Sequence, residues 1–378
     1  MEKPTPARQA EFAEALDFID QVFRPGQAGR FVLKRNYPHA YRPEYARRIL
    51  LQRDQGNIVG CLAIHPLTIR MAEARLVAGG IGAVGTDPQR RGEGIMGRLL
   101  QAADTHMRRA GYPLSVLWGD RQRYGWFGWE KGGIRNSFTL CSRQLGRPSA
   151  AERRLRLEHF VPSPALCRRL QRLERSQPYG VERPLRDIAP LFHRLGRQTW
   201  ICREGKRIAY LALQREGRQR HGAYETLEEA GGDTELIRSM LRLLFAREGL
   251  SRLQAGAGPN PDQIEALLPI SSNWARECAC MLKILDLPLL LTQVQPLVRR
   301  LAASAGVRGR FNLLSPCHRG QLDLGPGGHH RLEMSDQDLV ALLFGLHPLA
   351  EHRLGAVAAG VLARVLPLPL FIPSNNYI

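Results

Sequence analysis

The sequence predicts an α/β protein with mixed sheets, in which strands and helices alternate through three successive regions. In the first region, "NIVGCLAIHPLTIRM" and "ARLVAGGIGAVGT" have the apolar, β-branched composition of strands joined by a tight turn. A helix with one apolar face follows them, and then another strand. The second region repeats this order of three strands, a helix and a strand. We therefore expect a degenerate internal repeat, although the sequence identity between the two regions is low.

The helix of the first region is predicted from about Gly94 to Ala110. Ile95, Leu99 and Ala103 are spaced for one buried face, and Gly111 stands at the C-terminal cap position. "PLSVLW" then reads as a short buried strand, and it leads into the aromatic-rich stretch "GDRQRYGWFGWEKGG".

The charged stretch "GRPSAAERRLRLEH" reads as a linker into the second region. There "TWICREGKRIAYLALQ" predicts a hairpin with its turn at Glu204-Gly205-Lys206, and Asp233 is the expected cap of the helix in "TELIRSMLRLLFAREG". The third region contains a helix near "LLTQVQPLVRRLAASAG", three short strands, a helix capped at Ser335 with Asp338 in the capping-box position, and a last apolar helix. We place the domains at 1–150, 151–285 and 286–378.

The net charge of +19 does not by itself favour a nucleic-acid partner. Only five of the 54 basic residues are lysine, a bias that is typical of a GC-rich coding sequence, and the arginines are spread along the chain. No interleaved aromatic residues accompany them, as they do in proteins that bind single strands. We interpret the charge as a solvated surface.

The seven cysteines have scattered spacing, so the sequence predicts neither a disulfide framework nor a metal site. Cys278 and Cys280 alternate in a predicted strand and would point to opposite faces of its sheet. The N-terminus lacks the apolar core of a signal peptide, and the longest apolar run, "LPLPLFI", is too short to span a membrane. We therefore expect a cytoplasmic protein.

One loop carries two competing phosphate-binding patterns. Gly92-Glu93-Gly94-Ile95-Met96-Gly97 matches the dinucleotide fingerprint G-x-G-x-x-G, and Asp120 lies at the distance expected of a ribose-binding acid. Against this reading, the residues from Thr86 to Arg91 separate the preceding strand from the first glycine. At least two strands also precede the glycine-bearing one, whereas the dinucleotide fold normally begins with that strand.

The same loop also matches Q/R-x-x-G-x-G/A, since Gln89-Arg90-Arg91-Gly92-Glu93-Gly94 follows a strand and opens a helix at Ile95. Unsatisfied N–H groups and the helix dipole attract anions at a helix N-terminus. Glycines at 92 and 94 let the backbone approach a diphosphate closely. Arg90 and Arg91 add positive charge for its phosphates.

This second pattern is the pyrophosphate loop of the GNAT acetyltransferases. The stretch from Val77 to Gly133, including the Y-x-x-F-G-W run from Tyr124 to Trp129, resembles one multi-domain branch of that family, the enhanced intracellular survival (Eis) group. The specific resemblance covers about residues 10 to 140. It implies tandem GNAT folds followed by a sterol-carrier-like α+β domain, and acetyl-CoA as the cosubstrate. The second region lacks the loop, so we expect it not to bind acetyl-CoA.

The resemblance also implies roles for site residues. A backbone N–H near Val84 would polarise the thioester carbonyl, and Tyr124 would be the general acid toward the departing thiolate. The C-terminal carboxylate, here that of Ile378, would return to the active site as the base for the amine. Packing of Tyr124 among the aromatic residues is the alternative to its catalytic role. Asp120 and His65 are alternative bases.

The function expected from these features is transfer of an acetyl group to a primary amine of a small molecule or a lysine, by direct attack. The alternatives are a non-catalytic acyl-CoA-binding scaffold and a basic nucleic-acid-binding protein. The intact loop and Tyr124 argue against the scaffold. By analogy with the Eis-like branch we also expect a homo-oligomer, and we expect no membrane partner.

Overall fold

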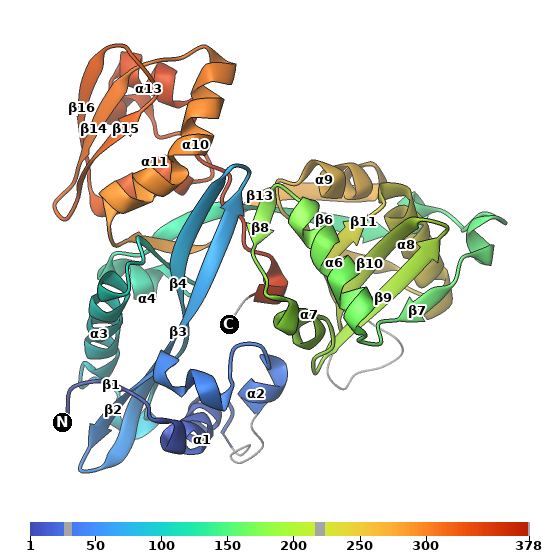
Figure 1. Cartoon of the computed structure of the whole chain (residues 1–378), viewed down its shortest axis with the longest axis horizontal. Coiled ribbons are helices and arrows are strands. Elements are labelled where there is room, and N and C mark those ends of the chain that lie inside the picture. Colours follow the sequence, from blue (N-terminus) through green and yellow to red (C-terminus); the bar gives the residue numbers. More distant parts are fainter. Residues whose placement is uncertain (26–31, 216–223, 377–378) are drawn as a thin grey trace. The chain divides into compact units, whose positions relative to one another are not determined.

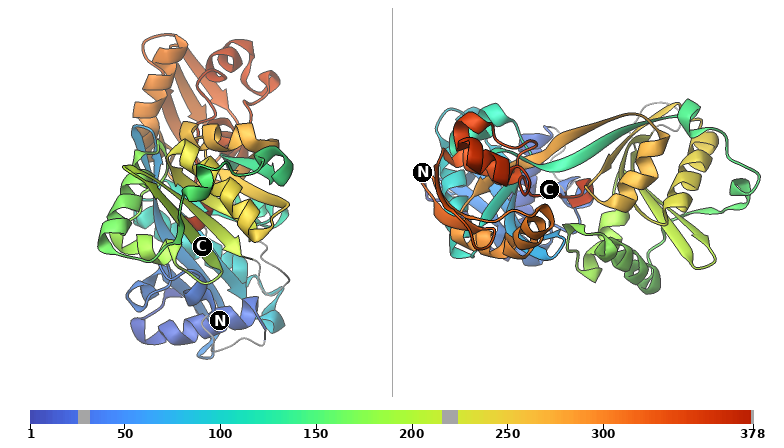
Figure 2. Two further views of the ribbon diagram at one scale, coloured as in Figure 1. Left: turned by 90° about the vertical axis from the view of Figure 1, so that its right-hand side faces the viewer. Right: turned by 90° about the horizontal axis from the view of Figure 1, so that it is seen from above.

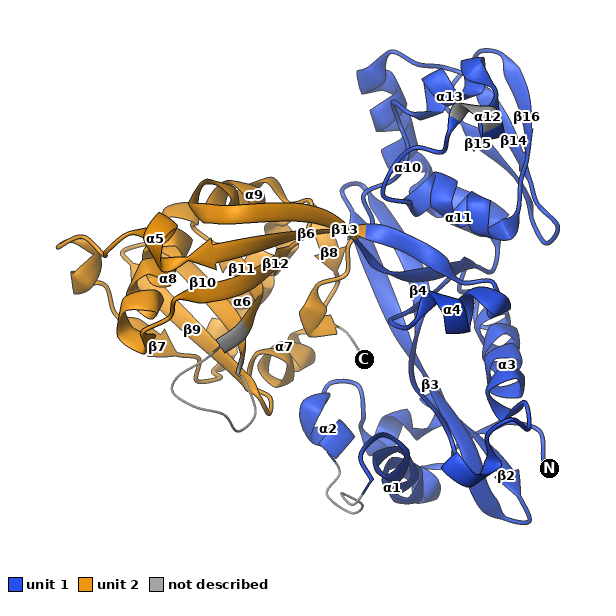
Figure 3. Cartoon of the chain, turned by 180° about the vertical axis from the view of Figure 1, so that it is seen from behind, with its two compact units in different colours: residues 1–133, 278–370, 378 blue, residues 134–277, 371–377 orange. Residues whose placement is uncertain are grey.

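A computed structural model describes residues 1–25, 32–215 and 224–376. The chain forms two compact units (Figure 3). Unit 1 contains residues 1–133 and 278–370, and unit 2 contains residues 134–277 together with the described tail residues 371–376. The α/β class with mixed sheets is confirmed. The division into three domains stays a prediction.

Unit 1 is built on a mixed sheet whose strands are mostly antiparallel neighbours. Its strands, in sheet order, are β1 (Thr5–Pro6), β2 (Ile49–Asp54), β3 (Asn57–Met71), β4 (Ala74–Thr86), β5 (Leu114–Leu117) and the end of β13 (Ser271–Ile284). Its N-terminal helices are α1 (Phe12–Phe23), α2 (Val32–Asn36), α3 (Ile95–Arg109) and α4 (Arg121–Tyr124). The pair β4–β5 is parallel, because the chain crosses over through α3 between these strands.

Both faces of this sheet are covered, which explains the nearly continuous apolar runs of β3 and β4. Leu62 and Ile64 of β3 pack with Leu99 and Ala103 of α3 on one face. Side chains of β3 with the opposite parity pack against α1 and the segment around Tyr41 on the other face. The predicted helix at 94–110 is thus confirmed, and Gly111, at φ +75°, follows its C-cap.

The C-terminal part of unit 1 is a small α+β layer attached to β4. It contains a three-stranded sheet in the order β15-β14-β16, and its elements are α10 (Leu287–Ala305), β14 (Arg310–Leu314), β15 (Arg319–Asp323), β16 (His329–Glu333), α11 (Asp336–Phe344), α12 (Glu351–Leu354) and α13 (Ala356–Leu362). α10 lies beside β4 (Figures 1 and 2), where the Val77 N–H donates to Gln293 Oε1 at 2.9 Å. The predicted cap is confirmed, because Ser335 Oγ accepts from the Asp338 N–H. The sterol-carrier likeness of this part stays a prediction.

Within unit 2 the strands of the sheet follow the order β6-β12-β11-β10-β9-β7. Its strands are β6 (Glu130–Cys141, from Ile134 onward), β7 (Leu157–His159), β8 (Tyr179–Val181), β9 (Arg197–Glu204), β10 (Arg207–Arg215), β11 (Tyr224–Gly232) and β12 (Arg252–Ala257), and its helices are α5 (Ser142–Leu145), α6 (Pro164–Ser176), α7 (Leu185–Phe192), α8 (Thr234–Glu248) and α9 (Pro261–Leu267). The predicted hairpin is confirmed, with Glu204 paired to Arg207 around Gly205.

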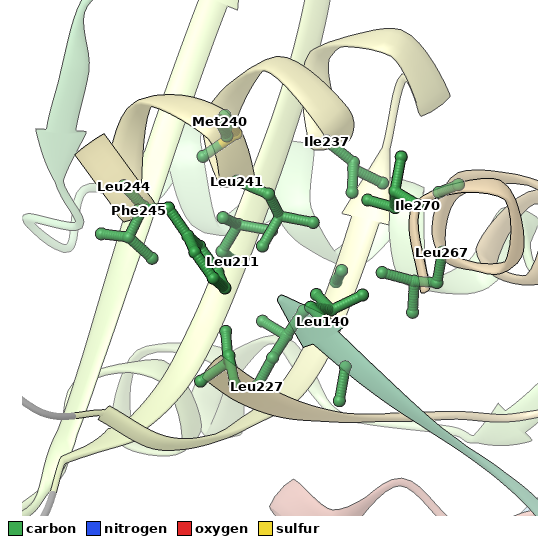
Figure 4. Close-up of a cluster of buried hydrophobic side chains, with 14 of the residues drawn as sticks. Leu140, Leu211, Leu227, Ile237, Met240, Leu241, Leu244, Phe245, Leu267 and Ile270 are labelled. Carbon is green, nitrogen blue, oxygen red and sulfur yellow. The ribbon is translucent and has the colours of Figure 1, made fainter. Parts of the chain in front are cut away.

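The core of unit 2 lies between α8 and the sheet (Figure 4). Leu211 of β10 and Leu227 of β11 meet Met240, Leu241 and Leu244 of α8, all of them buried. The opposite face of the sheet is covered by α6 and α7, which pack against Tyr210 and other residues of β9 and β10. Each face of this sheet thus carries helices, as in unit 1.

The two units share one order of elements, as the repeat in the sequence predicts. β2-β3-β4-α3-β5 in unit 1 corresponds to β9-β10-β11-α8-β12 in unit 2. In each set the first three strands are antiparallel, and the strand after the helix returns parallel to the third. None of the helices in the described parts of the chain is long and apolar enough to cross a membrane.

Candidate active site

The end of β4 in unit 1 is open on one side. The ladder between β4 and β5 ends at the pair Ile81–Leu117, whereas β4 continues to Thr86. Against β3, Cys61 pairs with Gly85 and Ala63 pairs with Gly82, so Ala83 and Val84 together stand opposite one residue. This is a β-bulge, with Ala83 held at φ +49°. A bulge turns backbone groups out of the ladder, and here it does so beside the gap between β4 and β5.

The loop from Asp87 to Gly94 joins this open strand end to α3. The Asp87 side chain accepts from the Gln89 N–H at 2.9 Å and caps a short 3-10 turn, Pro88–Arg90. Gly92 and Gly94 have φ of +86° and +73°, a region that side chains with a Cβ rarely adopt. The geometry of the loop therefore depends on both glycines that the sequence pattern contains.

Gly94 is also the N-cap of α3, and it gives that helix no side-chain cap. The first N–H groups of a helix have no partner within the helix, and the helix dipole adds positive potential there. Gly92, Glu93 and Gly94 are exposed residues, and the chain becomes buried at Ile95. This N-terminus fits a diphosphate.

The two arginines of the loop differ in their surroundings. Arg90 Nε donates to Glu93 Oε1 at 2.6 Å, and its Nη2 donates to Asp54 Oδ2 at 3.0 Å. The hydrogen bond from Arg90 lowers the pKa of Glu93, so this carboxylate stays charged and neutralised within the loop. Arg91 is exposed, and it forms no ion pair with any residue that the structure describes. Arg91 is thus the more accessible of the two arginines, and phosphate binding by Arg90 and Arg91 stays a prediction.

The dinucleotide reading of the loop does not fit this geometry. The glycine-bearing strand is the fourth of the sheet in chain order, and Asp87–Arg91 separates it from Gly92. Asp120, the expected ribose-binding acid, is instead the N-cap of α4, where its carboxylate accepts from the Gln122 N–H at 2.9 Å. If Asp120 acted as the alternative base, its carboxylate would have to give up this capping hydrogen bond.

Tyr124 ends α4 and is buried, with 8 % of its surface exposed. Its ring meets the edge of Trp129, with centroids 6.5 Å apart, and belongs to the apolar cluster that also contains Leu117 at the end of β5. A Cβ on Gly119 would come within 2.3 Å of the Tyr124 ring, so only glycine leaves room for this ring position. Burial raises the pKa of the Tyr124 phenol, which therefore stays protonated.

His65, the other alternative base, is 4 % exposed on β3. Its ring packs edge-on against Tyr41, with centroids 4.9 Å apart. Burial lowers the pKa of His65 to about 3, and the charge of Arg48 adds to the shift. A neutral imidazole with so low a pKa is a poor proton acceptor, which agrees with a structural role.

Ile378, whose carboxylate the resemblance makes the base, lies outside the described residues. The last described residues, Ser374, Asn375 and Asn376, are buried in unit 2. There they meet a buried ion pair, Arg183–Glu229, which the sequence analysis missed. The one local signal was a pair of consecutive glutamates, Glu228-Glu229, within a predicted strand.

Comparison with known protein families finds a match in the first part of the chain. Residues 3–132 match the family model of the acetyltransferase (GNAT) domain. No curated protein matches the sequence.

Solved structures of similar fold extend over the whole chain. A GCN5-related N-acetyltransferase from Anabaena variabilis has a TM-score of 0.71 at 16% identity, with 100% of each chain covered. One from Kribbella flavida has a TM-score of 0.69 at 18% identity, covering 100% of this chain and 98% of its own. Eis1 from Mycobacterium abscessus has a TM-score of 0.62 at 12% identity, again with 100% of each chain covered. At these identities the likeness shows a shared fold.

Proposed function

Since residues 3–132 are a GNAT acetyltransferase domain and such domains use acetyl-CoA, we propose that this enzyme acetylates a primary amine. The acceptor is an amine of a small molecule or a lysine, and the amine attacks the thioester directly. The observation that carries the proposal is the helix N-terminus at Gly94, which has no side-chain cap and follows the bulged, unpaired end of β4.

The loop holds the diphosphate of the cosubstrate. The backbone N–H groups from Gly92 to Ile95 supply hydrogen bonds at the positive end of α3. Arg91 supplies a free guanidinium, and Gln89 lies in the same turn. Arg90 and Glu93 shape the loop through their ion pair. The six residues from Gln89 to Gly94 thus divide into two groups, one that contacts phosphate and one that holds the loop.

The bulge at Ala83–Val84 supplies the oxyanion donor. A backbone N–H near Val84, turned out of the β3–β4 ladder, donates to the thioester carbonyl oxygen as negative charge develops there. A backbone donor requires no particular side chain, so the Val84 side chain is free to pack against the cluster under α3.

Tyr124 is the general acid of the reaction, and the C-terminal carboxylate is its general base. As the amine nitrogen bonds to the carbonyl carbon and the carbon–sulfur bond breaks, Tyr124 donates its phenolic proton to the departing sulfur. The raised pKa of Tyr124 keeps that proton available near neutral pH. The α-carboxylate of Ile378 takes the proton that the amine loses.

Release of free coenzyme A thiol, measured over a panel of primary amines, tests this function. We expect saturable thiol release that depends on an amine and scales with enzyme concentration, together with an acetylated product of the added mass. Binding of acetyl-CoA without thiol release from any amine would contradict the proposal and would favour an acyl-CoA-binding scaffold.

A further inference from the structure

The described end of the chain is polar yet buried in unit 2. Ser374 and Asn376 are 7 % and 5 % exposed, and Asn375 is fully buried. Figure 1 shows this 3-10 turn, η7 (Ser374–Asn376), beside α7 of unit 2. Buried amide side chains are costly unless they are hydrogen-bonded, so a specific set of partners must hold this segment.

Those partners form around a buried ion pair. Arg183, whose side chain is 1 % exposed, makes two parallel hydrogen bonds of 2.8 Å to the carboxylate of Glu229. The Tyr210 hydroxyl donates to Glu229 Oε1 at 2.7 Å. Burial alone would raise the pKa of Glu229, but Arg183 outweighs burial and lowers it, so the pair stays ionised.

The tail completes this network. Asn376 Oδ1 accepts from Arg183 Nε at 2.9 Å and from Arg183 Nη2 at 2.5 Å. Asn375 Nδ2 donates to Glu229 Oε2 at 3.1 Å. Consecutive tail residues thus bind the cation and the anion of one ion pair, which fixes both the register and the direction of the chain end.

This network lies at the end of β11, just beyond the point where β11 stops pairing with β12. β11 has a bulge at Glu228, because Ala212 pairs with Glu229 and Leu213 pairs with Leu227. The β11–β12 ladder ends just before it, at the pair Leu227–Ala255. Unit 1 has the same arrangement, in which the β4–β5 ladder ends just before the bulge at Ala83–Val84. Glu229 is thus the first paired residue of β11 after its bulge, as Gly85 is the first paired residue of β4 after its bulge.

The tail contacts the ends of both β11 and β12. Phe371 lies over Gly258, the residue after β12, where a Cβ would come within 2.4 Å of its ring. Asn375 binds Glu229 at the end of β11. Arg183 and Tyr210 lie on the α6–α7 face of the sheet, which corresponds to the α1–α2 face of unit 1.

We infer that unit 2 binds the chain's own C-terminal segment through Arg183 and Glu229, an arrangement that we call the clamp. Within unit 2 this segment lies at the strand ends that correspond to the candidate active site of unit 1. Arg183 and Glu229 are positioning residues: they hold Asn375 and Asn376, and through them the chain end that carries the Ile378 carboxylate. The effect on turnover rests on the proposed function, in which that carboxylate is the base. Holding the tail does not rest on it.

Carboxypeptidase digestion of the full-length protein, followed by intact mass, tests the clamp without reference to activity. In the wild type we expect digestion to stop before Asn375 is removed. Glu229→Gln and Asn376→Ala should lose several further residues at least tenfold faster. Glu228→Gln is the matched control: Glu228 is the neighbouring residue of β11, its ion pair is with Arg197 at 3.4 Å, and we expect digestion as in the wild type. Equal digestion of all four proteins would overturn the clamp.

Steady-state kinetics on these proteins and on Arg183→Lys test whether Arg183 and Glu229 position the chain end for catalysis. We expect Glu229→Gln and Asn376→Ala to lower kcat about tenfold or more while leaving KM for acetyl-CoA within about twofold, and Arg183→Lys to keep part of kcat because it keeps the charge. Asn376→Ala changes the tail itself, so it should leave the core of unit 2 folded. Faster digestion with an unchanged kcat would overturn positioning. A wild-type protein without thiol release would contradict the proposed function, and the digestion pattern would still decide the clamp.

Discussion

The N-termini of α3 in unit 1 and of α8 in unit 2 follow the same order of strands, but they differ in whether an anion can bind there. In unit 1, α3 starts at Ile95 behind an eight-residue loop, and its N-cap Gly94 supplies no side chain. In unit 2, α8 starts at Thr234 directly after β11, and its N-cap Asp233 accepts from the Leu236 N–H at 2.9 Å. A carboxylate already fills the anion position of α8. The same fold is thus open to a phosphate in one unit and closed in the other.

The strands before those helices show the same contrast. After the bulge, β4 has Gly85, where a Cβ would lie 3.2 to 3.4 Å from Cys61 and α1 side chains. β11 has Glu229 at that position, bound to Arg183 and to the tail. The position after the bulge thus carries no side chain in unit 1, whereas in unit 2 it carries a carboxylate that binds Arg183 and the tail. Fold alone therefore does not decide function here.

The largest effect should come from giving unit 1 the cap of unit 2. Gly94→Asp puts a carboxylate at the N-terminus of α3, where it would cap the helix and repel a diphosphate. Aspartate tolerates the φ of +73° better than most residues. We expect acetyl-CoA affinity to fall by about 100-fold, or about 2.8 kcal/mol. Gly94→Asn, which is isosteric and uncharged, should lose much less. Equal losses in both variants would show that shape, not charge, closes the site.

Removing the phenol of Tyr124 should lower turnover almost as strongly. Tyr124→Phe keeps the ring against Trp129 and Gly119 and deletes the proton donor. We expect kcat to fall by about 100-fold, with acetyl-CoA affinity and thermal stability nearly unchanged. Tyr112→Phe, a tyrosine packed against the same cluster, is the control and should keep its kcat. Normal turnover in Tyr124→Phe would remove Tyr124 from the mechanism.

Shortening the chain tests the base without disturbing the clamp. Removal of Tyr377 and Ile378 leaves the contacts of Asn375 and Asn376 in place. We expect kcat to drop by about tenfold or more, while the melting temperature and resistance to carboxypeptidase stay at the values of the full chain. A shortened protein with full turnover would show that the carboxylate of Ile378 is not the base.

The smallest effect concerns pH and stability in unit 1. The pKa of His65 is about 3 in the folded chain, against a reference value of 6.5. Between these values the unfolded chain binds one more proton, so the free energy of unfolding should fall as pH drops below 6.5, by about 1.4 kcal/mol per pH unit. Denaturant titrations from pH 7 to 5 would measure this slope. His65→Gln should flatten it, whereas His106→Gln, on the exposed surface of α3, should not.

The sequence predicted features that depend on neighbouring residues. The start of α3, the hairpin at Gly205 and the cap at Ser335 follow from local patterns, and all three are present. The ion pair of Arg90 with Asp54 was missed because the two residues are 36 positions apart in the chain. The bulge was missed because Ala83 carries no sign of its positive φ.

The clamp was harder to predict from the sequence than these features. Arg183 and Asn376 are 193 residues apart, and each is ordinary in its own segment. An arginine that will be buried resembles the many exposed arginines of this chain until its partners are known. Distant polar partners are therefore the part of this site that only the structure supplies.

The most direct test of the central contrast is calorimetric titration of the full-length protein with acetyl-CoA and, separately, with NADPH. We expect saturable binding of acetyl-CoA at one site per chain, at the α3 N-terminus, loss of that binding in Gly94→Asp, and no binding of NADPH. Binding of NADPH in place of acetyl-CoA, or one site that persists unchanged in Gly94→Asp, would contradict the assignment of this loop as the cradle for the coenzyme A diphosphate.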